Sequence, residues 1–238
     1  MPDPSIREFV DESLDPRVRG WLHLPETSTS DILVLTHSAG SNANAPLLVA
    51  LAETFCGAAF TVLRVDLPYR QTRPYGPPGP GDAARDRAGL RNAITAMKNL
   101  PDLDSAPSKG SRIFLGGHSY GGRQSSMLCA ELSKEDPDLV AGLLLLSYPL
   151  HPPRKPEQQR TQHLPDLRTP TLFVSGTRDP FGSIEELERA IKMIPAKTGL
   201  LPIEGAGHDL GFKGKAKQEE LTRQIFADFA AFFKELAS

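Results

Sequence analysis

Three side chains in this sequence have the types that acyl transfer to a serine requires. Ser119 lies in the stretch GGHSYGG, Asp179 in VSGTRDPFGS and His208 in IEGAGHDLGF. A serine hydroxyl is a weak nucleophile until a histidine accepts its proton, and a carboxylate holds that histidine in the right orientation. The sequence therefore predicts Ser119 as the nucleophile, His208 as the general base and Asp179 as the orienting carboxylate.

The glycines around Ser119 indicate a sharp turn from a strand into a helix. Residues 117–121 fit the pattern G-x-S-x-G, which is short enough to occur by chance, but an apolar run precedes it and a helix-forming run follows it. At such a turn a Cβ two positions before or after the serine would meet neighbouring backbone, which explains Gly117 and Gly121. The stretch fits neither of the usual glycine-rich phosphate-binding patterns. We therefore expect a turn that presents a nucleophile.

An oxyanion hole would complete the site, and backbone N–H groups from two loops can form it. One N–H belongs to the residue after the nucleophile, Tyr120, and the other comes from a loop after an earlier strand, THSAGSNAN. By position Ala39 supplies the second N–H, with Ser38 as the alternative. The same loop is also compatible with a plain turn before a helix, with Asn42 or Asn44 near the N-cap.

Two further histidines lie close to these loops. His118 is adjacent to Ser119, but its side chain leaves the turn in the other direction, so we expect it to pack or hydrogen-bond beneath the turn. His151 follows a predicted strand, in a loop at the edge where ligands bind to α/β sheets, and it is a candidate substrate contact. Neither histidine is expected to be the general base.

Apolar runs that alternate with helical patterns predict the sheet that carries these loops. The runs are apolar on both faces, as in strands of a buried parallel sheet, whereas 17–25 alternates and predicts an edge or antiparallel strand. The order of elements predicts an α/β fold with a mostly parallel, doubly wound sheet and helices on both faces. The predicted strands are 31–37, 58–66, 111–117, 139–149, 169–176 and 198–205, and the predicted helices are about 45–56, 82–99, 120–134, 184–193 and 217–236.

Two proline-rich polar loops, 68–82 and 148–170, interrupt this pattern, each after the carboxyl end of a strand. The second loop is too short and too rich in proline for a large cap domain, so we expect an open cleft. Both loops carry arginines, and Arg70 stands close to the end of its strand. Its guanidinium could bind a carboxylate of the substrate, or it could be an ordinary solvated loop charge.

Composition narrows the class of partner. The net charge of −2 and the pI near 6.3 provide no basic surface for nucleic acid or for an anionic membrane, so a small-molecule substrate is expected. No secretory leader and no membrane-spanning run is visible, which predicts a cytoplasmic protein. Cys56 and Cys129 form no C-x-x-C pair and are expected to be buried as small hydrophobes. The length of 238 residues predicts a single domain, 1–238, and leaves the oligomeric state open.

Several stretches together resemble one group within the α/β-hydrolase superfamily. The group is similar to dienelactone hydrolases and contains testis-expressed members and members of nonspecific-lethal chromatin complexes. The resemblance runs from about residue 31 to the C-terminus and implies the α/β-hydrolase fold, with the triad Ser119, Asp179 and His208. The stretches that carry it are THSAGSN, DLPYR, IFLGGHSYGGR, LSYPLHPPRKPE, HLPDLRTPTLFVSGTRDPFGS and GAGHDL.

The sequence departs from the pattern of this group at two places. The loop usually read as H-G-A-G is HSAG at 37–40, and the turn carries His118 and Tyr120 where Lys and Met are more common. Dienelactone hydrolases proper use a cysteine nucleophile, whereas this chain has serine. We therefore expect a carboxylesterase-like serine hydrolase that cleaves a small ester or thioester through an acyl-enzyme, with no metal or organic cofactor. The alternative is a non-catalytic interaction scaffold of the same fold.

Overall fold

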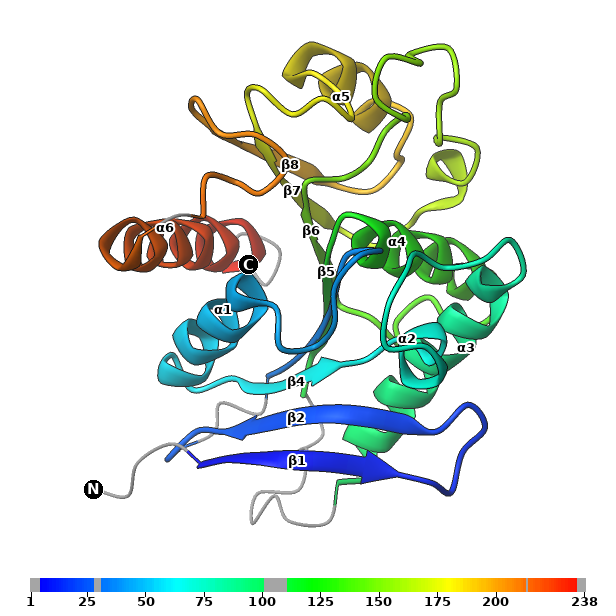
Figure 1. The fold of residues 1–238 in the computed structure, drawn as a ribbon, viewed down its shortest axis with the longest axis vertical. Coiled ribbons are helices and arrows are strands. Elements are labelled where there is room, and N and C mark those ends of the chain that lie inside the picture. The colour runs from blue at the N-terminus through cyan, green and yellow to red at the C-terminus, as the bar shows by residue number, and fades with distance from the viewer. Residues whose placement is uncertain (1–4, 28–30, 101–110, 213, 235–238) are drawn as a thin grey trace.

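Eight strands form one sheet through the centre of the molecule, as a computed structural model shows (Figure 1). The structure describes residues 5–27, 31–100, 111–212 and 214–234. The spatial order of the strands is β1-β2-β4-β3-β5-β6-β7-β8, and all neighbours from β4 to β8 in this order run parallel, whereas β1, β2 and β4 pair antiparallel. The strands are β1 (Ser5–Asp11), β2 (Val18–Leu24), β3 (Ile32–Thr36), β4 (Thr61–Val65), β5 (Ile113–His118), β6 (Gly142–Leu146), β7 (Thr171–Gly176) and β8 (Thr198–Ile203).

Helices cover both faces of the sheet. One face carries α1 and α6, and the other carries α3, α4 and α5 (Figure 1). Two short elements lie in loops, namely α2 directly after β4 and the 3-10 helix η1 between β6 and β7, which packs near the C-terminal end of α4. The helices are α1 (Pro46–Gly57), α2 (Pro68–Thr72), α3 (Asp82–Lys98), α4 (Tyr120–Leu132), η1 (Leu164–Asp166), α5 (Ile184–Ile191) and α6 (Lys215–Lys234).

Alternating side chains of the central strands divide the core into two layers. In β3, Ile32 and Val34 pack in the layer with α3 and α4, whereas Leu33 and Leu35 pack in the layer with α1 and α6. Because both faces of this strand are covered, all five of its residues are buried. Burying such aliphatic side chains stabilises the fold by about 2 kcal/mol each. The apolar runs in the sequence therefore reflect burial on both faces of the sheet.

The expected α/β fold, with a mostly parallel sheet and helices on both faces, is confirmed, and the differences from the predicted elements lie at one edge and in two loops. Strand β2 is antiparallel as expected, but it is not an edge strand, because β1 pairs along its outer side. None of β1, α2 and η1 was predicted: the residues of β1 are mostly exposed, and α2 and η1 have only five and three residues. The helix predicted over 217–236 is α6, and its last two predicted residues lie outside the described ones.

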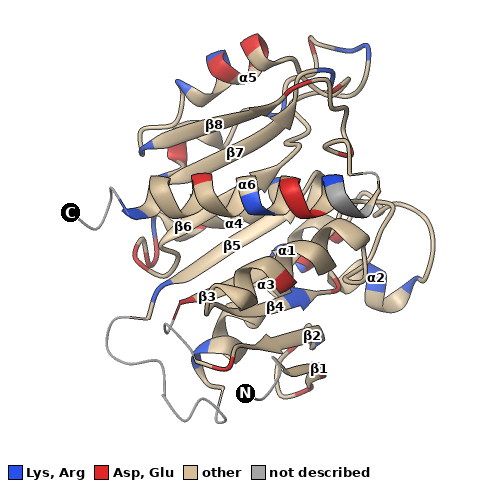
Figure 2. Ribbon diagram, turned by 90° about the vertical axis from the view of Figure 1, so that its left-hand side faces the viewer, with Lys and Arg blue, Asp and Glu red and all other residues tan. Residues whose placement is uncertain are grey.

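The loop between β6 and β7 contains only η1, and no cap domain is inserted anywhere among the described residues. This agrees with the sequence prediction of a fold without a large cap. In the part of the chain that the structure describes, no helix is both long and apolar enough to cross a membrane. Basic and acidic residues are interspersed along α6 and over the loops, as Figure 2 shows.

Candidate active site

Ser119 lies on a sharp turn between β5 and α4. It follows the last residue of β5, His118. Its backbone has φ 53° and ψ −114°, a conformation that residues other than glycine rarely adopt. The Ser119 N–H donates to the carbonyl of Leu146 at 2.8 Å, which ties the turn to the end of β6. The strained backbone thus raises the serine above the carboxyl edge of the sheet.

Two glycines allow this turn because other backbone passes very close to them. A Cβ on Gly117 would lie 2.5 Å from the nitrogen of Gly122, and a Cβ on Gly121 would lie 2.5 Å from the carbonyl oxygen of His37. Both distances are shorter than any van der Waals contact between such atoms. The sequence prediction that these positions lack room for a Cβ is therefore confirmed.

The three candidate residues meet in one hydrogen-bonded chain. His208 Nε2 lies 2.8 Å from Ser119 Oγ, and His208 Nδ1 lies 2.8 and 3.0 Å from the two carboxylate oxygens of Asp179. Because a carboxylate only accepts, Nδ1 donates to it, and Nε2 is left to accept the proton of the serine hydroxyl. The structure therefore brings together a nucleophile and a base in the arrangement that proton transfer needs.

Asp179 and His208 lie on loops that follow neighbouring strands, β7 and β8. The Asp179 side chain is almost fully buried, and one of its oxygens also accepts the N–H of Phe181 at 2.9 Å. The ring of Phe181 packs on the ring of His208 with 4.1 Å between centroids. The carboxylate and the phenyl ring together restrict the orientation of the imidazole.

His118 supports the loop of the base and does not contact the nucleophile's hydroxyl. Its Nε2 lies 2.8 Å from the backbone carbonyl of His208, which can only accept, so His118 donates through this nitrogen. Burial lowers the pKa of His118, which keeps the ring neutral. This geometry matches the expectation that His118 hydrogen-bonds beneath the turn.

The two peptides that flank Ala39 are held by side chains. His37 Nδ1 donates to the carbonyl of Ser38 at 2.9 Å, and the Tyr69 hydroxyl donates to the carbonyl of Ala39 at 2.8 Å. In a trans peptide the N–H points opposite to the C=O, so holding the Ser38 carbonyl also fixes the Ala39 N–H. Among the described residues, neither this N–H nor that of Tyr120 has a hydrogen-bond acceptor. Both expected oxyanion donors are therefore free to bind a ligand.

His37 is completely buried beneath this loop. Since Nδ1 donates to Ser38, Nε2 is the acceptor for the N–H of Leu67, at 3.1 Å. Burial lowers the pKa of His37 to about 4, which keeps the imidazole neutral and able to accept. One neutral histidine thus connects the loop after β3 to the loop after β4.

Arg70 does not lie at the carboxyl edge as a free cation. Its guanidinium is buried and donates to the backbone carbonyls of Ala39, Ser41, Arg73 and Gly76, at 2.7 to 3.1 Å. These bonds engage the donors that a substrate carboxylate would need. The geometry therefore disfavours the expected role as a substrate anchor and indicates that Arg70 holds the oxyanion loop.

His151 is also buried, with both ring nitrogens facing protein acceptors. Nδ1 lies 2.8 Å from the carbonyl of Pro152, and Nε2 lies 3.4 Å from a carboxylate oxygen of Glu186 at the start of α5. Its backbone N–H donates to the carbonyl of Phe181, the residue that packs on His208. His151 therefore lies behind the loop of Asp179, and its ring contacts protein rather than an open cleft.

The residues that sequence reasoning missed are those that support the oxyanion loop from a distance. Tyr69 and Asp86 come from α2 and α3, and Asp86 is fully buried. A signal for Asp86 was present, because it occupies the same helix face as Leu90, Ala93 and Met97, where an apolar residue is expected. No comparable signal marks Tyr69.

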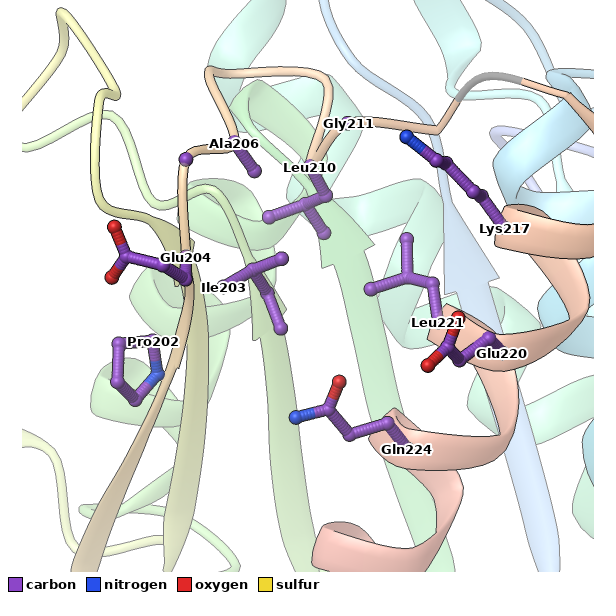
Figure 3. A pocket seen from close by; sticks show the side chains of 11 residues that line it. Pro202, Ile203, Glu204, Ala206, Leu210, Gly211, Lys217, Glu220, Leu221 and Gln224 are labelled. Atoms are coloured by element: carbon purple, nitrogen blue, oxygen red, sulfur yellow. The ribbon is translucent and has the colours of Figure 1, made fainter.

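A cavity of about 490 Å³ lies beside the loop of His208, on the side of α6 (Figure 3). Ile203, Leu210 and Leu221 point toward its centre, and the charged residues of its lining are Glu204, which follows β8, and Lys217 and Glu220 of α6. Neither Ser119 nor His208 lines this cavity. Within the described residues, no group of three or more His, Cys, Asp or Glu side chains could hold a metal ion.

Three solved structures with a similar fold are each less than 25% identical to this chain, so they establish the fold alone. They include a dienelactone hydrolase from Anabaena variabilis, with 21% identity, coverage of 93% of this chain and 97% of that chain, and a TM-score of 0.70. An alpha-beta serine hydrolase homologue from Coxiella burnetii has 15% identity, coverage of 96% and 98%, and a TM-score of 0.71. A serine hydrolase without a lid from Xanthomonas campestris has 12% identity, coverage of 99% and 96%, and a TM-score of 0.65.

A sequence model of one protein family matches most of the chain. The family is described as an alpha/beta hydrolase domain, and the match covers residues 29–235. This range includes every strand from β3 to β8 and the three residues that form the hydrogen-bonded chain. By this match the chain belongs to the alpha/beta hydrolase domain family.

Proposed function

We propose that this protein is a serine hydrolase that cleaves a small ester or thioester through an acyl-enzyme. The observation that carries the proposal is the hydrogen-bonded chain from Ser119 Oγ through His208 to Asp179, with both contacts of His208 at 2.8 Å. The serine lies on a strained turn, and the N–H groups of Ala39 and Tyr120, which have no acceptor among the described residues, lie in the loop after β3 and at the start of α4. This combination meets the geometric needs of acyl transfer.

Acylation begins when a substrate carbonyl reaches Ser119. His208 Nε2 accepts the hydroxyl proton while Oγ bonds to the carbonyl carbon, and the carbonyl oxygen becomes an oxyanion. The N–H groups of Tyr120 and Ala39 donate to this oxyanion. The tetrahedral intermediate then collapses, the bond to the alcohol or thiol breaks, and the leaving group takes the proton from His208.

Deacylation repeats these steps with water as the nucleophile. His208 accepts a proton from water, the hydroxide oxygen bonds to the acyl carbon, and the Ser119 Oγ bond breaks as the proton returns to the serine. The Asp179 carboxylate accepts the Nδ1 hydrogen bond of His208 and stabilises the imidazolium formed in each half-reaction. The cycle releases a carboxylic acid and uses only the residues named, so it needs no metal and no organic cofactor.

Substrate size and location form part of the same proposal. The absence of a cap domain among the described residues favours small, dissolved substrates, because no mobile lid is present to cover a long acyl chain. Both cysteines are free and buried, which suits a reducing compartment, and we place the protein in the cytoplasm. The name of one similar structure, a dienelactone hydrolase, agrees with an ester-type substrate.

A fluorophosphonate probe tests the proposal directly, because it phosphonylates a serine that a neighbouring base activates. We expect the full-length protein to be labelled and Ser119→Ala to remain unlabelled. Ser13→Ala is the matched control, since Ser13 lies in the turn between β1 and β2, and it should label like the wild type.

An unlabelled wild-type protein would contradict the proposal. That outcome would favour the non-catalytic interaction scaffold, the alternative suggested by the resemblance to chromatin-complex members. Labelling that persists in Ser119→Ala would show that another residue is the nucleophile. Either result can be read on a single gel, with thermal unfolding as a check that each variant is folded.

A further inference from the structure

A buried carboxylate that the proposed mechanism does not use connects the two oxyanion loops. Asp86, on α3, has no exposed surface. One of its oxygens accepts the backbone N–H of Tyr69 at 3.1 Å, and the other accepts the hydroxyl of Tyr120 at 2.7 Å. Burial and the carboxylate raise the pKa of the Tyr120 phenol, which therefore stays protonated and donates. One carboxylate thus holds two tyrosines from different helices.

Each of these tyrosines leads to one of the expected oxyanion donors. Tyr120 supplies its own backbone N–H, and fixing its hydroxyl restricts rotation of the first residue of α4. The Tyr69 hydroxyl donates to the carbonyl of Ala39 at 2.8 Å, next to the second donor. The two rings also pack edge to face, with 5.9 Å between centroids. A shift of Asp86 would therefore move both donors.

We propose that Asp86 is a positioning residue that fixes the N–H groups of Ala39 and Tyr120 relative to each other, through Tyr69 and the Tyr120 side chain. The inference rests on the proposed hydrolase function, because those N–H groups matter only if an oxyanion forms between them. Asp86 touches no reacting atom in this arrangement. It acts by holding the two loops at the spacing that the oxyanion requires.

Stability of the fold alone does not explain why a carboxylate occupies this buried position. Burying an ionised group is unfavourable unless it is paired, and among the described residues no salt bridge is formed by Asp86. Its two partners are an amide and a phenol, both neutral. An apolar residue at this position of α3 would pack in the core at lower cost. A carboxylate is needed at this position if its two hydrogen bonds hold the two oxyanion loops in place.

The packing of α3 against α2 brings Asp86 to Tyr69. One turn further along α3, a Cβ on Gly89 would lie 2.5 Å from Cγ of Pro68. The glycine therefore lets the first residue of α2 pack directly on α3. Because Pro68 precedes Tyr69, this contact sets the distance over which the Tyr69 N–H reaches Asp86.

The test is Asp86→Asn in the full-length protein. Asparagine keeps the size of the side chain but replaces one carboxylate oxygen with an NH2 group. The remaining oxygen can still accept the Tyr69 N–H, so the hydrogen bond that the Tyr120 hydroxyl donates to the carboxylate is lost, and that hydroxyl must turn to accept from the NH2 group. We expect kcat for p-nitrophenyl acetate to fall about 10- to 100-fold, with KM changed less than about threefold, because an oxyanion forms only after binding. The affinity for a trifluoromethyl ketone, which forms a tetrahedral adduct with a reactive serine, should fall by the same factor as kcat.

Two further variants separate positioning from folding. Tyr120→Phe removes only the hydroxyl and keeps the backbone N–H, and we expect a similar loss of kcat. Because the two side chains act through one hydrogen bond, the double variant should be hardly slower than Asp86→Asn alone. Asp82→Asn is the matched control: Asp82 lies one turn earlier on α3, pairs with Arg73, and makes no contact with the tyrosines. Its kcat should stay within about twofold of the wild type.

The outcomes distinguish this inference from the proposed function. If the wild-type protein neither hydrolyses esters nor reacts with a fluorophosphonate, both the proposed hydrolase function and the role of Asp86 are wrong. An active wild type whose kcat survives Asp86→Asn and Tyr120→Phe overturns the role of Asp86 alone. A rise in KM as large as the fall in kcat would also overturn the role of Asp86, because it would show a general effect on substrate binding. If Asp86→Asn does not fold, Tyr120→Phe decides by the same criteria.

Discussion

The triad side and the oxyanion side of the candidate site are held by different kinds of contact. On the triad side, three side chains touch one another directly, from Ser119 to His208 to Asp179. On the oxyanion side, the important groups are backbone N–H groups, and side chains from other elements hold the adjacent carbonyls. A direct chain depends on each of its members, whereas a loop held at several points retains part of its geometry when one of them is lost.

The chemistry of the two sides explains this difference. A base must contact the proton that it removes, so its side chain cannot be replaced by a more distant group. An oxyanion donor is part of the main chain, and only its orientation can be adjusted. Several side chains share that task here, namely His37, Tyr69 and Arg70. We therefore expect substitutions on the triad side to have much larger effects.

The largest effect is expected on the triad side, for His208→Ala. Removal of the base should lower kcat by about 10⁵- to 10⁶-fold, because members of such a triad act as a unit. His118→Ala is the matched control, since His118 lies next to Ser119 but donates to the backbone of His208. Losing that one hydrogen bond should cost about tenfold at most. Steady-state ester hydrolysis measures both variants, and comparable kcat values for wild type and His208→Ala would sink the assignment of the base.

The sequence predicts the triad side of the site better than the oxyanion side. Ser119, Asp179 and His208 each come directly after a predicted strand, so their meeting at one edge of the sheet follows from the order of the strands. Arg70 shows the limit of such reasoning. Its place near a strand end was visible, but whether its guanidinium turns to solvent or to the backbone of Ala39 depends on contacts across about 30 residues of sequence.

The fold divides in a similar way. The strands from β3 to β7 were predicted because burial on both faces leaves an uninterrupted apolar run, and β8 was predicted from a shorter apolar run although it is a half-buried edge strand. Strand β1 was missed because it is an exposed edge whose apolar residues are interrupted by charged ones without a regular period, and Ile6 and Val10 remain about half exposed. Asp86 was missed because its partners come from other elements, although a carboxylate on an apolar helix face was a usable signal.

An intermediate effect is expected on the oxyanion side, for Arg70→Gln. Glutamine cannot replace the bonds to all four carbonyls, but Tyr69 and His37 still hold the loop, so kcat should fall about 10- to 100-fold. The loss should be the same for a neutral ester and for an analogue that bears a carboxylate. Arg73→Gln is the matched control, because Arg73 lies on the same segment and pairs with Asp82 near the surface.

Kinetics with the two esters distinguish this role from substrate binding. The ratio of kcat/KM for the anionic to the neutral ester should be unchanged in Arg70→Gln. A loss confined to the anionic ester would show that Arg70 binds the substrate carboxylate after all, and that the buried guanidinium is released when substrate enters. Equal losses of kcat/KM for the two esters would instead show that Arg70 acts on the oxyanion loop, and that Tyr69 and His37 hold part of the loop's geometry without it.

The smallest effect concerns pH, and it again separates the two sides. Two buried histidines lie behind the oxyanion loop: His37, already described, and His23 on β2, whose Nε2 accepts from Arg64 Nε at 2.9 Å. Arg64 in turn donates to the carbonyl of Ala43, at the end of that loop. Burial lowers the pKa of each of these histidines from 6.5 to about 4. Both must therefore stay neutral for the network to persist.

Between pH 6.5 and pH 4 each histidine is protonated in the unfolded chain and neutral in the folded protein. Unfolding then takes up protons, so acid favours the unfolded state, and the free energy of unfolding should fall by about 1.4 kcal/mol per pH unit for each histidine. The contribution is complete above pH 6.5 and lost as pH falls toward 4. His23→Gln keeps an acceptor for Arg64 but does not titrate, so urea denaturation from pH 7 to pH 5 should show a slope lower by about 1.4 kcal/mol per pH unit between pH 6 and pH 5. An unchanged slope would mean that His23 is not held neutral, and that acid does not act on the oxyanion side through this contact.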